Sequence, residues 1–369
     1  MSNTTRIEAL IQRYRTNAFL TTPFISPVAR DASDLSVDQP AADLEPRVVE
    51  EVVAGLRSGN THYVDVPGMG PVRDVLLAEL QALGAEGFTQ ATTLVTSSVQ
   101  EGRFLAIQTI AGIGGAIATQ EVLHPGARAA LGIRPLDVRT LDDDAANGFL
   151  PSPEAIEAAL RSGARVVYLE HPNRLSGATF SAEAVAAIAA SVVDANAHLI
   201  VDQGLAPWVD GFVSFASRAE LAGRLTVIGE ALPGRGLEGF GIGYLATSEE
   251  HVGAITKLKQ VMSICTSTPS QLAVQAASTD AAAKRNELHA ALGAARERTV
   301  AAARQAGFDV IDGGASAVVA LRHTDLAGRT AALAAAGINV ANGADFGAPD
   351  VVRVSITADG RAADVFSRA

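Results

Sequence analysis

The chain has 369 residues, of which 48% are hydrophobic and 19% are charged, and its formal net charge is −11 at pH 7. This length and composition are typical of a soluble globular protein with one large core or two domains. The acidic balance argues against nucleic-acid binding as the main function. Because no apolar stretch reaches membrane-spanning length and no signal-peptide core is visible, we expect no membrane contact and a cytoplasmic location.

Side chains with nucleophilic or metal-binding chemistry are few. Cys265 is the only cysteine, which excludes an internal disulfide and fits a reducing compartment. The seven histidines lack the HExxH type of spacing, so we expect no metal site. Lysine is rare as well, and only three positions could form an imine with a carbonyl compound: Lys257, Lys259 and Lys284.

Residues 51–250 alternate strand-like and helix-like segments, which predicts a large α/β domain. The helical pattern at 181–196 begins at Ser181, a residue type that caps helices. Continuous apolar strands between helices indicate a mostly parallel sheet covered on both faces, and ligands bind at the carboxyl ends of such strands. The expected strands are 92–98, 164–171, 197–204, 224–231 and 239–247.

The two ends of the chain are predicted to form a second, smaller domain. Residues 1–50 would supply an N-terminal arm and part of this domain. Residues 251–369 begin with long helical patterns and continue with strand candidates at 316–323 and 351–357. This order predicts a linking helix followed by a small α+β domain.

Six segments carry recognisable motifs: THYVDVPGMGPVRDVLLAEL (61–80), LVTSSVQEGRFLAIQ (94–108), EHPNRLSG (170–177), LIVDQGLAPWV (199–209), GEALPGRGLEGFGIGY (229–244) and INVANGADFGAPDVVRVSIT (338–357). In this order they resemble the class I/II aminotransferases, which have the type I fold of pyridoxal-phosphate (PLP) enzymes. The resemblance implies an α/β protein whose large domain has a mostly parallel, seven-stranded sheet beside a smaller α+β domain. It also implies a homodimer, because type I sites are built from both subunits.

One position in segment 229–244 departs from the resemblance. The family has a lysine there that forms the internal aldimine and moves the substrate proton, which requires an amine beside the cofactor. Alignment of the glycines places Pro233 at this position. Proline has no side-chain amine, and Lys257 and Lys259 are interpreted as helix-surface residues.

Five further cofactor contacts of the family are altered. Glu230 and Gly241 stand where a serine and an arginine donate to the cofactor phosphate, and a carboxylate there repels phosphate. Arg174 and Leu205 stand where an asparagine and a tyrosine hydrogen-bond the ring hydroxyl, and Ala127 stands where an aromatic residue stacks on the ring. Together these changes predict that PLP no longer binds in the usual way.

Three positions of the family are retained. Asp202 stands where the family holds the pyridine nitrogen, with capping of a loop at the strand end as the alternative. Arg353 aligns with the arginine that binds the substrate carboxylate, with an internal salt bridge as the alternative, since an unpaired buried charge is costly. Tyr63 matches the tyrosine that reaches the neighbouring subunit's site, or is an ordinary interface aromatic.

Several polar groups are new near the same cavity. His171 and Glu230, together with Asp202, are candidate acid/base groups, because burial and charged neighbours move pKa values toward neutrality. Each is also open to a plainer interpretation, as a solvated loop residue or a member of a structural ion pair. Trp208 either lines the pocket or fills the core, and the core is favoured. The candidate substrate-binding groups are Arg353, Arg174, Arg235, Asn173 and Tyr63.

Three hypotheses account for this pattern. The first is an enzyme that performs acid/base chemistry on a small carboxylate- or amino-acid-like metabolite without PLP, in specialised metabolism. The second is an enzyme that binds PLP or pyridoxamine phosphate (PMP) without a covalent lysine. The third is a noncatalytic relative that binds a ligand or regulates. Because charges are exchanged in the pocket and not merely lost, the first is favoured, and with it the expectation that no cofactor is used.

Overall fold

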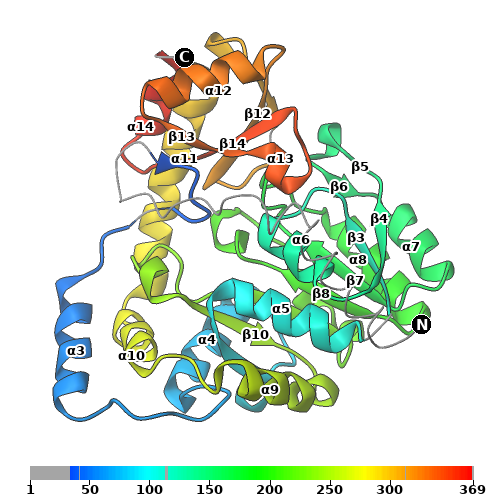
Figure 1. Cartoon of the computed structure of the whole chain (residues 1–369), viewed down its shortest axis with the longest axis vertical. Coiled ribbons are helices and arrows are strands. Elements are labelled where there is room, and N and C mark those ends of the chain that lie inside the picture. Colours follow the sequence, from blue (N-terminus) through cyan, green and yellow to red (C-terminus); the bar gives the residue numbers. More distant parts are fainter. Residues whose placement is uncertain (1–33, 41, 113–114, 312, 368–369) are drawn as a thin grey trace, which may run out of the picture.

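The computed structural model describes residues 34–40, 42–112, 115–311 and 313–367 (Figure 1). Most of the predicted N-terminal arm, residues 1–33, lies outside the described residues. Among the described residues, no helix is long and apolar enough to cross a membrane.

A seven-stranded sheet forms the centre of the larger part of the molecule. Only β10 runs antiparallel to its neighbours, so the sheet is mostly parallel, as predicted. In spatial order the strands are β2 (Thr93–Ser97), β10 (Ile242–Ala246), β9 (Leu225–Glu230), β8 (His198–Asp202), β7 (Val166–Glu170), β3 (Ala116–Gln120) and β4 (Asp137–Leu141).

Alternate side chains of these strands enter two separate apolar cores, one on each face of the sheet. In β7, for example, Val167 and Leu169 belong to one core, while Val166 and Tyr168 belong to the other. Burial on both faces explains why the strands read as continuous apolar runs in the sequence. The covering helices are α4 (Gly70–Ala82), α7 (Pro153–Arg161), α8 (Ala182–Asp194) and α10 (Thr268–Ala277) on the first face, and α5 (Ser98–Ile110), α6 (Pro125–Gly132) and α9 (Glu249–Ser263) on the second.

A five-stranded sheet in the smaller part brings together both ends of the described chain (Figure 1). Its strand order is β1 (Asp34–Leu35), β13 (Asn339–Asn342), β14 (Val351–Ser355), β12 (Val318–Arg322) and β11 (Asp309–Ile311). Besides short 3-10 helices, the remaining elements of the described residues are α3 (Pro46–Arg57), α11 (Ala281–Gln305), α12 (Leu326–Ala335), α13 (Gly343–Phe346), α14 (Arg361–Asp364) and the hairpin of β5 (Asp143–Asp144) and β6 (Leu150–Pro151). The small sheet has a core of its own, which also takes up Leu205 and Trp208 from the large sheet's side.

Helix starts follow the local sequence. The Ser181 side chain accepts a hydrogen bond from the backbone N–H of Ala184 at 3.2 Å, so Ser181 caps α8 as predicted. Helix α5 begins directly after β2, and its Gly102 lies so close to β9 that a Cβ atom would stand 2.4 Å from Cγ2 of Ile228. The absence of a side chain at Gly102 therefore sets how closely α5 packs on the sheet.

Gly102→Ala tests this close packing. We expect the substitution to lower the free energy of unfolding by about 1–3 kcal/mol, because the added methyl group overpacks the contact with Ile228. Gly253→Ala in α9 is the matched control: its Cβ meets nothing within 4 Å, so better helix propensity should raise stability by about 0.5–1 kcal/mol. Urea unfolding measures both, and equal effects of the two substitutions would contradict the packing argument.

Candidate functional site

Three neighbouring parallel strands each end in a carboxylate. Glu170 ends β7, Asp202 ends β8 and Glu230 ends β9, and Glu170 and Asp202 are direct partners in the strand register. Glu170 and Asp202 are completely buried, whereas the Glu230 side chain is 21% exposed. Acidic groups at adjacent carboxyl ends place a concentrated negative charge at the edge where such sheets bind ligands.

Two arginines neutralise Asp202. Nε and Nη2 of Arg103, from α5, lie 2.8 and 2.7 Å from Oδ2 of Asp202. Nε and Nη2 of Arg174, from the turn after β7, lie 3.1 and 2.7 Å from Oδ1. Oδ1 also accepts the backbone N–H of Gly204 at 3.0 Å. Burial by itself would raise the pKa of Asp202, but the two guanidinium groups outweigh it and hold this pKa well below its usual range.

Arg174 links Asp202 to Glu230. Its Nη2 donates to Oε1 and Oε2 of Glu230 at 3.1 and 3.3 Å. The Nη1 atom of Arg174 is buried and has no hydrogen-bond partner among the described residues. A buried donor without a partner is uncommon, and it gives this site one N–H group that a ligand oxygen can accept.

Glu170 holds a proton more readily than an ordinary carboxyl group. Its oxygens accept the backbone N–H groups of His124 at 2.8 Å and Arg174 at 3.2 Å. Burial and then the charge of Asp202 raise the pKa of Glu170 to about 7. The pair therefore carries a firm negative charge on Asp202 and a proton on Glu170 below neutral pH.

His124 lies between the arginine cluster and the N-terminal segment. Its Nδ1 accepts hydrogen bonds from Nη1 of Arg103 at 2.9 Å and from the backbone N–H of Gly126 at 3.0 Å. Nε2 therefore carries the hydrogen and donates to Oδ2 of Asp38 at 2.7 Å. Burial and the charge of Arg103 lower the pKa of His124 to about 4, which keeps the ring neutral.

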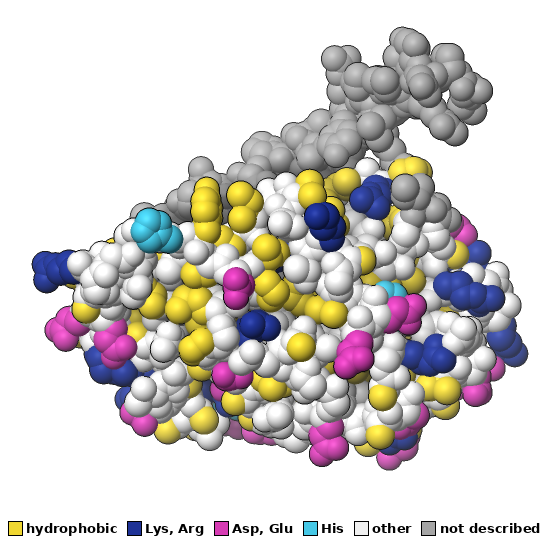
Figure 2. Space-filling view, turned by 90° about the horizontal axis from the view of Figure 1, so that it is seen from below, with side chains coloured by type: hydrophobic (Ala, Val, Ile, Leu, Met, Phe, Trp, Pro, Cys, Tyr) yellow, Lys and Arg dark blue, Asp and Glu magenta, His cyan; other side chains and the backbone are white. Residues whose placement is uncertain are grey.

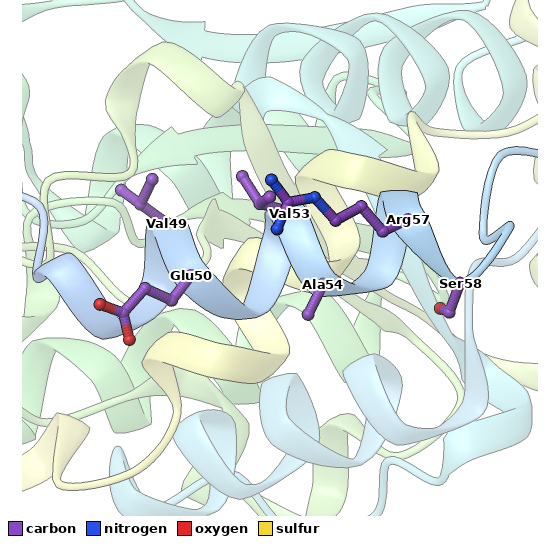
Figure 3. Close-up of a pocket in the computed structure, with 6 residues that line it drawn as sticks. All are labelled: Val49, Glu50, Val53, Ala54, Arg57 and Ser58. Atoms are coloured by element: carbon purple, nitrogen blue, oxygen red, sulfur yellow. The ribbon is translucent and has the colours of Figure 1, made fainter.

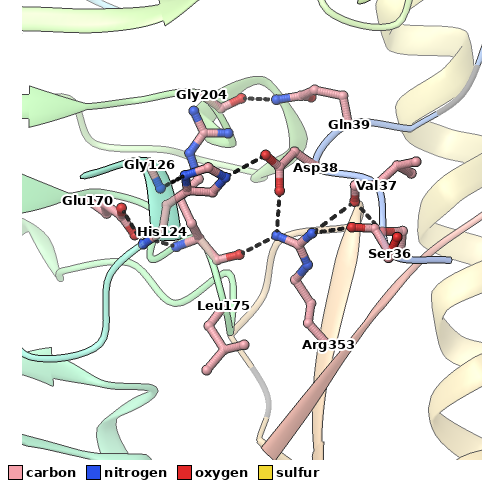
Figure 4. Close-up of polar contacts among 12 residues, drawn as sticks. Ser36, Val37, Asp38, Gln39, His124, Gly126, Glu170, Leu175, Gly204 and Arg353 are labelled. Atoms are coloured by element: carbon pink, nitrogen blue, oxygen red, sulfur yellow. Dashed lines mark hydrogen bonds and ion pairs between the residues drawn. The ribbon is translucent and has the colours of Figure 1, made fainter. Parts of the chain in front are cut away.

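Arg353 joins the small sheet to this cluster (Figure 4). Its Nη1 lies 2.8 Å from Oδ1 of Asp38 and donates to the backbone oxygen of Arg174 at 3.0 Å. Its Nη2 donates to the backbone oxygens of Ser36 at 2.8 Å and Val37 at 3.1 Å. Of the two interpretations offered for Arg353, the internal salt bridge is present, with Asp38 as its partner.

Other sequence-predicted residues lie apart from the cluster. His171 is buried among the rings of Phe180, Phe212 and Phe215. Its Nδ1 accepts the backbone N–H of Phe180 at 3.3 Å and its Nε2 lies 2.9 Å from the backbone oxygen of Val213. Burial lowers the pKa of His171 to about 4. The structure therefore brings Asp202, Glu230, Arg174 and Arg353 together, but not His171.

Asn173, Arg235 and Tyr63 have separate roles. Oδ1 of Asn173 accepts the backbone N–H groups of Leu175 and Ser176, which shapes the turn that presents Arg174. Arg235 is buried and pairs with Glu45 at 3.1 Å, away from Asp202. Tyr63 is 80% exposed on the connection between α3 and α4.

The residues that replace cofactor contacts of the family lie in a loop and in the apolar cores. Pro233 lies in the loop between β9 and β10, and the oxygen of Gly241 at the end of this loop accepts the backbone N–H of Ser98 at 2.7 Å. Ala127 and Leu205 are fully buried in apolar cores. Trp208 is a core residue, as favoured, and its Nε1 donates to Gln39 at 2.8 Å.

The interpretation of Lys259 as a surface residue is wrong, whereas Lys257 is exposed as expected. Lys259 is fully buried and its Nζ lies 2.7 Å from Oε2 of Glu101 and 3.0 Å from Oγ1 of Thr266. The same Glu101 oxygen accepts the backbone N–H of Ser97 at 2.5 Å, at the start of α5. The Lys259 amine is therefore engaged by Glu101 and Thr266.

Four members of the cluster escaped the sequence analysis: Asp38, Arg103, His124 and Glu170. Glu170 could have been found, because it ends an apolar strand just as Asp202 does. The other three come from the N-terminal arm, helix α5 and the N-cap of helix α6, which are far apart in the chain, and no local pattern joins them. Within the described residues, no group of His, Cys, Asp and Glu is suited to hold a metal ion.

Comparison with known proteins identifies the family. The description "Aminotransferase class I and II" matches residues 31–366, so the chain belongs to this family. The aspartate/prephenate aminotransferase of Thermus thermophilus is 25% identical over 272 residues, which cover 73% of this chain and 70% of the relative. The aspartate aminotransferase of Thermotoga maritima is 21% identical over 245 residues, or 66% of this chain and 65% of the relative. The match thus spans about two thirds of this relative's length.

Solved structures agree in fold. A double mutant of the Thermus thermophilus aspartate aminotransferase superposes with a TM-score of 0.82 at 20% identity, covering 100% of this chain and 96% of that chain. An aminotransferase from Mycobacterium tuberculosis gives a TM-score of 0.82 at 22% identity, covering 98% and 93%. The predicted fold class, an α/β aminotransferase fold with a mostly parallel sheet, is confirmed.

The expectation that no cofactor is used is contradicted by this membership. The family and the matching relatives are aminotransferases, which depend on PLP, so the alternative of bound PLP or PMP is the more consistent one. The described residues do not fit covalent attachment, because the loop at Pro233 offers no amine. Asp202 ends β8, but it is fully buried and both of its oxygens already accept from Arg103 and Arg174. A ring nitrogen would therefore have to displace one of these donors.

Glu170→Gln tests the proton held at Glu170. Because the pKa of Glu170 is raised from 4.5 to about 7, the native state holds a proton on Glu170 at pH values between these two, where the unfolded state has released it. As pH rises through this window, the wild type should lose stability relative to the permanently neutral variant, by a few kcal/mol at most. Urea unfolding of both proteins at about pH 5 and about pH 8 measures the change, and the buried histidines cancel in the comparison. A difference that does not depend on pH would contradict the assignment.

Proposed function

We propose that the protein is an enzyme of the aminotransferase family that performs acid/base chemistry on a small carboxylate- or amino-acid-like metabolite. The site lies where β7, β8 and β9 end beside the small sheet. The observation that carries the proposal is the position of Arg174, held between Asp202 and Glu230 with a buried Nη1–H that lacks a partner. A ligand oxygen would accept a hydrogen bond from this N–H group. The positive charge of Arg174 would then stabilise negative charge that develops on that oxygen during the reaction.

The different exposure of Asp202 and Glu230 suggests different roles for the two carboxyl groups. Asp202 is buried and ionised, so it orients Arg174 and does not exchange protons near neutral pH. Glu230 is the member that reaches solvent, with a side chain that is 21% exposed. Glu230 is therefore the proposed proton-transferring group. His171 has no part in this proposal, because its ring lies among phenylalanines.

PLP or PMP is the proposed cofactor, held without a covalent bond. A protonated ring nitrogen would reach Asp202 only in place of one of the arginine donors that now engage both of its oxygens. When bound, such a ring would withdraw electrons from the substrate. The chain's own contribution remains the placement of charge by Arg103 and Arg174 and the proton handled by Glu230.

The cofactor proposal predicts a difference between wild type and Pro233→Lys. After incubation with PLP or PMP and desalting, wild type should retain the absorbance of the cofactor ring. After borohydride reduction, intact mass should show no adduct on the wild type, because no lysine stands in the loop, and one adduct on P233K incubated with PLP. Loss of the absorbance on desalting would refute cofactor binding. An adduct on the wild type, or none on the variant, would refute the place given to Pro233.

Glu230→Gln tests the acid/base role. Proton NMR in deuterium oxide detects chemistry at Cα as loss of the Cα–H signal, across a panel of amino acids and 2-oxo acids. Loss of a positioned base should slow exchange by roughly 10²–10⁴-fold. Glu238→Gln is the matched control, because it removes the same charge from an exposed position in the same loop. Equal exchange rates in E230Q and wild type would exclude Glu230 as the base.

We also propose that the chain forms a homodimer through the outer side of α3. Helix α3 carries exposed apolar side chains at Val49, Val53 and Leu56. Figure 3 shows Val49 and Val53 on the same side of this helix, in line with Arg57, along a shallow groove. Figure 2 views the molecule from the bottom of Figure 1, where exposed hydrophobic side chains lie among charged ones. Exposed apolar clusters of this kind mark contact surfaces.

A charge on α3 should break the proposed dimer. Val53→Asp places a carboxylate in the apolar surface and should weaken association by at least about tenfold, as expected for burial of an unpaired charge. Light scattering measures the mass. Glu50→Gln is the control on the same helix and should stay dimeric. A monomeric wild type would refute the proposed dimer.

A further inference from the structure

The buried guanidinium group of Arg353 already binds a carboxylate of the chain itself. Asp38 presents Oδ1 to Nη1 of Arg353 at 2.8 Å and Oδ2 to Nε2 of His124 at 2.7 Å (Figure 4). Both oxygens are thus engaged, each by a different donor. This is the arrangement in which a pair of positioned donors recognises a bound carboxylate.

The backbone that carries Asp38 is held independently of its side chain. We call residues 34–39 the strap. Within it, β1 pairs with β13, the Ser36 and Val37 oxygens accept from Arg353, and Val37 also accepts from Ser355. Nε2 of Gln39 donates to the Gly204 oxygen at 2.9 Å. None of these contacts uses the Asp38 carboxylate.

The Asp38 side chain is also the exposed member of its ion pair. It is 38% exposed, whereas the Arg353 side chain is 1% exposed and that of His124 is 16% exposed. A rotation of the Asp38 side chain into solvent would leave the strap in place and uncover two fixed donors. Arg353 cannot follow, because backbone oxygens of Arg174, Ser36 and Val37 hold its guanidinium group.

We propose that Asp38 is an internal competitor for this position: a ligand carboxylate binds Arg353 and His124 only by displacing the Asp38 side chain. The inference rests on the proposed function and adds how its ligand is recognised and restrained. Two carboxylates on one guanidinium group and one neutral imidazole would repel each other, so occupancy is exclusive. The ligand must carry a carboxylate, because a neutral amide would not replace the lost charge of Asp38.

The inference predicts that removing the competitor tightens carboxylate binding. Maleate is the probe, with sodium chloride at equal ionic strength as the reference for nonspecific anion effects, and calorimetry measures Kd. We expect Asp38→Ala to bind maleate at least about tenfold more tightly than wild type. Maleate should also raise the Tm of D38A more than that of wild type, since it restores the charge that Arg353 has lost. Asp38→Asn, which keeps the side-chain shape, should show a gain in the same direction if D38A folds poorly.

Two controls make the result specific. Asp43→Ala removes the same charge from an exposed position a few residues later, so it should bind maleate as wild type does. The double variant Asp38→Ala with Arg353→Gln should lose the gain. Equal maleate affinity in wild type, D38A and D38N, or an equal gain in D43A, would overturn the inference. Exchange of the substrate Cα–H is measured in a separate experiment, so equal maleate affinities would leave the proposed function untouched. If no Cα–H exchange is found but D38A binds maleate more tightly, the proposed function alone is refuted.

Discussion

The architecture of the site depends on one buried charge. Asp202 ends a central strand with no exposure to solvent, and a buried carboxylate without partners would cost several kcal/mol. Arg103 and Arg174 supply the partners from opposite directions, one from a helix on the sheet and the other from a turn at its edge. The position of Asp202 therefore constrains how α5 packs and how the turn after β7 is shaped. The role of Asn173 in that turn follows from the same constraint.

From this centre, charges of opposite sign alternate across the two sheets. Asp202 lies between Arg103 and Arg174, Arg174 continues to Glu230, and His124 connects Arg103 to the pair of Asp38 and Arg353. The cluster holds three arginines and four carboxyl groups, which are those of Asp38, Asp202, Glu230 and Glu170. Burial, and after it the charge of Asp202, raises the pKa of Glu170 within this cluster. Burial and specific neighbouring charges together therefore set the acid/base properties of the cluster.

The sequence was informative where burial is periodic. The strands of the sheet were recognisable because both of their faces are covered, and Asp202 stood out as a charge at the end of such a run. The edge strand β4, with mostly exposed or half-buried residues, gave no such signal, and β3 was not among the expected strands although it is buried. Lys259 was misjudged because helical spacing does not reveal that Glu101, 158 positions earlier, lies beside it. Hydrophobic patterns report where a side chain is buried, but they do not report which distant charge neutralises it.

The strap has a consequence for how the protein reaches its native state. Ser36 and Arg353 are 317 positions apart in the chain, yet they are hydrogen-bonded. Contacts of such sequence separation carry a large loop-closure entropy and form late in folding. The seven-stranded sheet and the other four strands of the small sheet can therefore assemble before the strap, with its edge strand β1, crosses between them. The anion position at Arg353 is then completed last, so an intact site reports that the whole chain has folded and that its beginning and end have met.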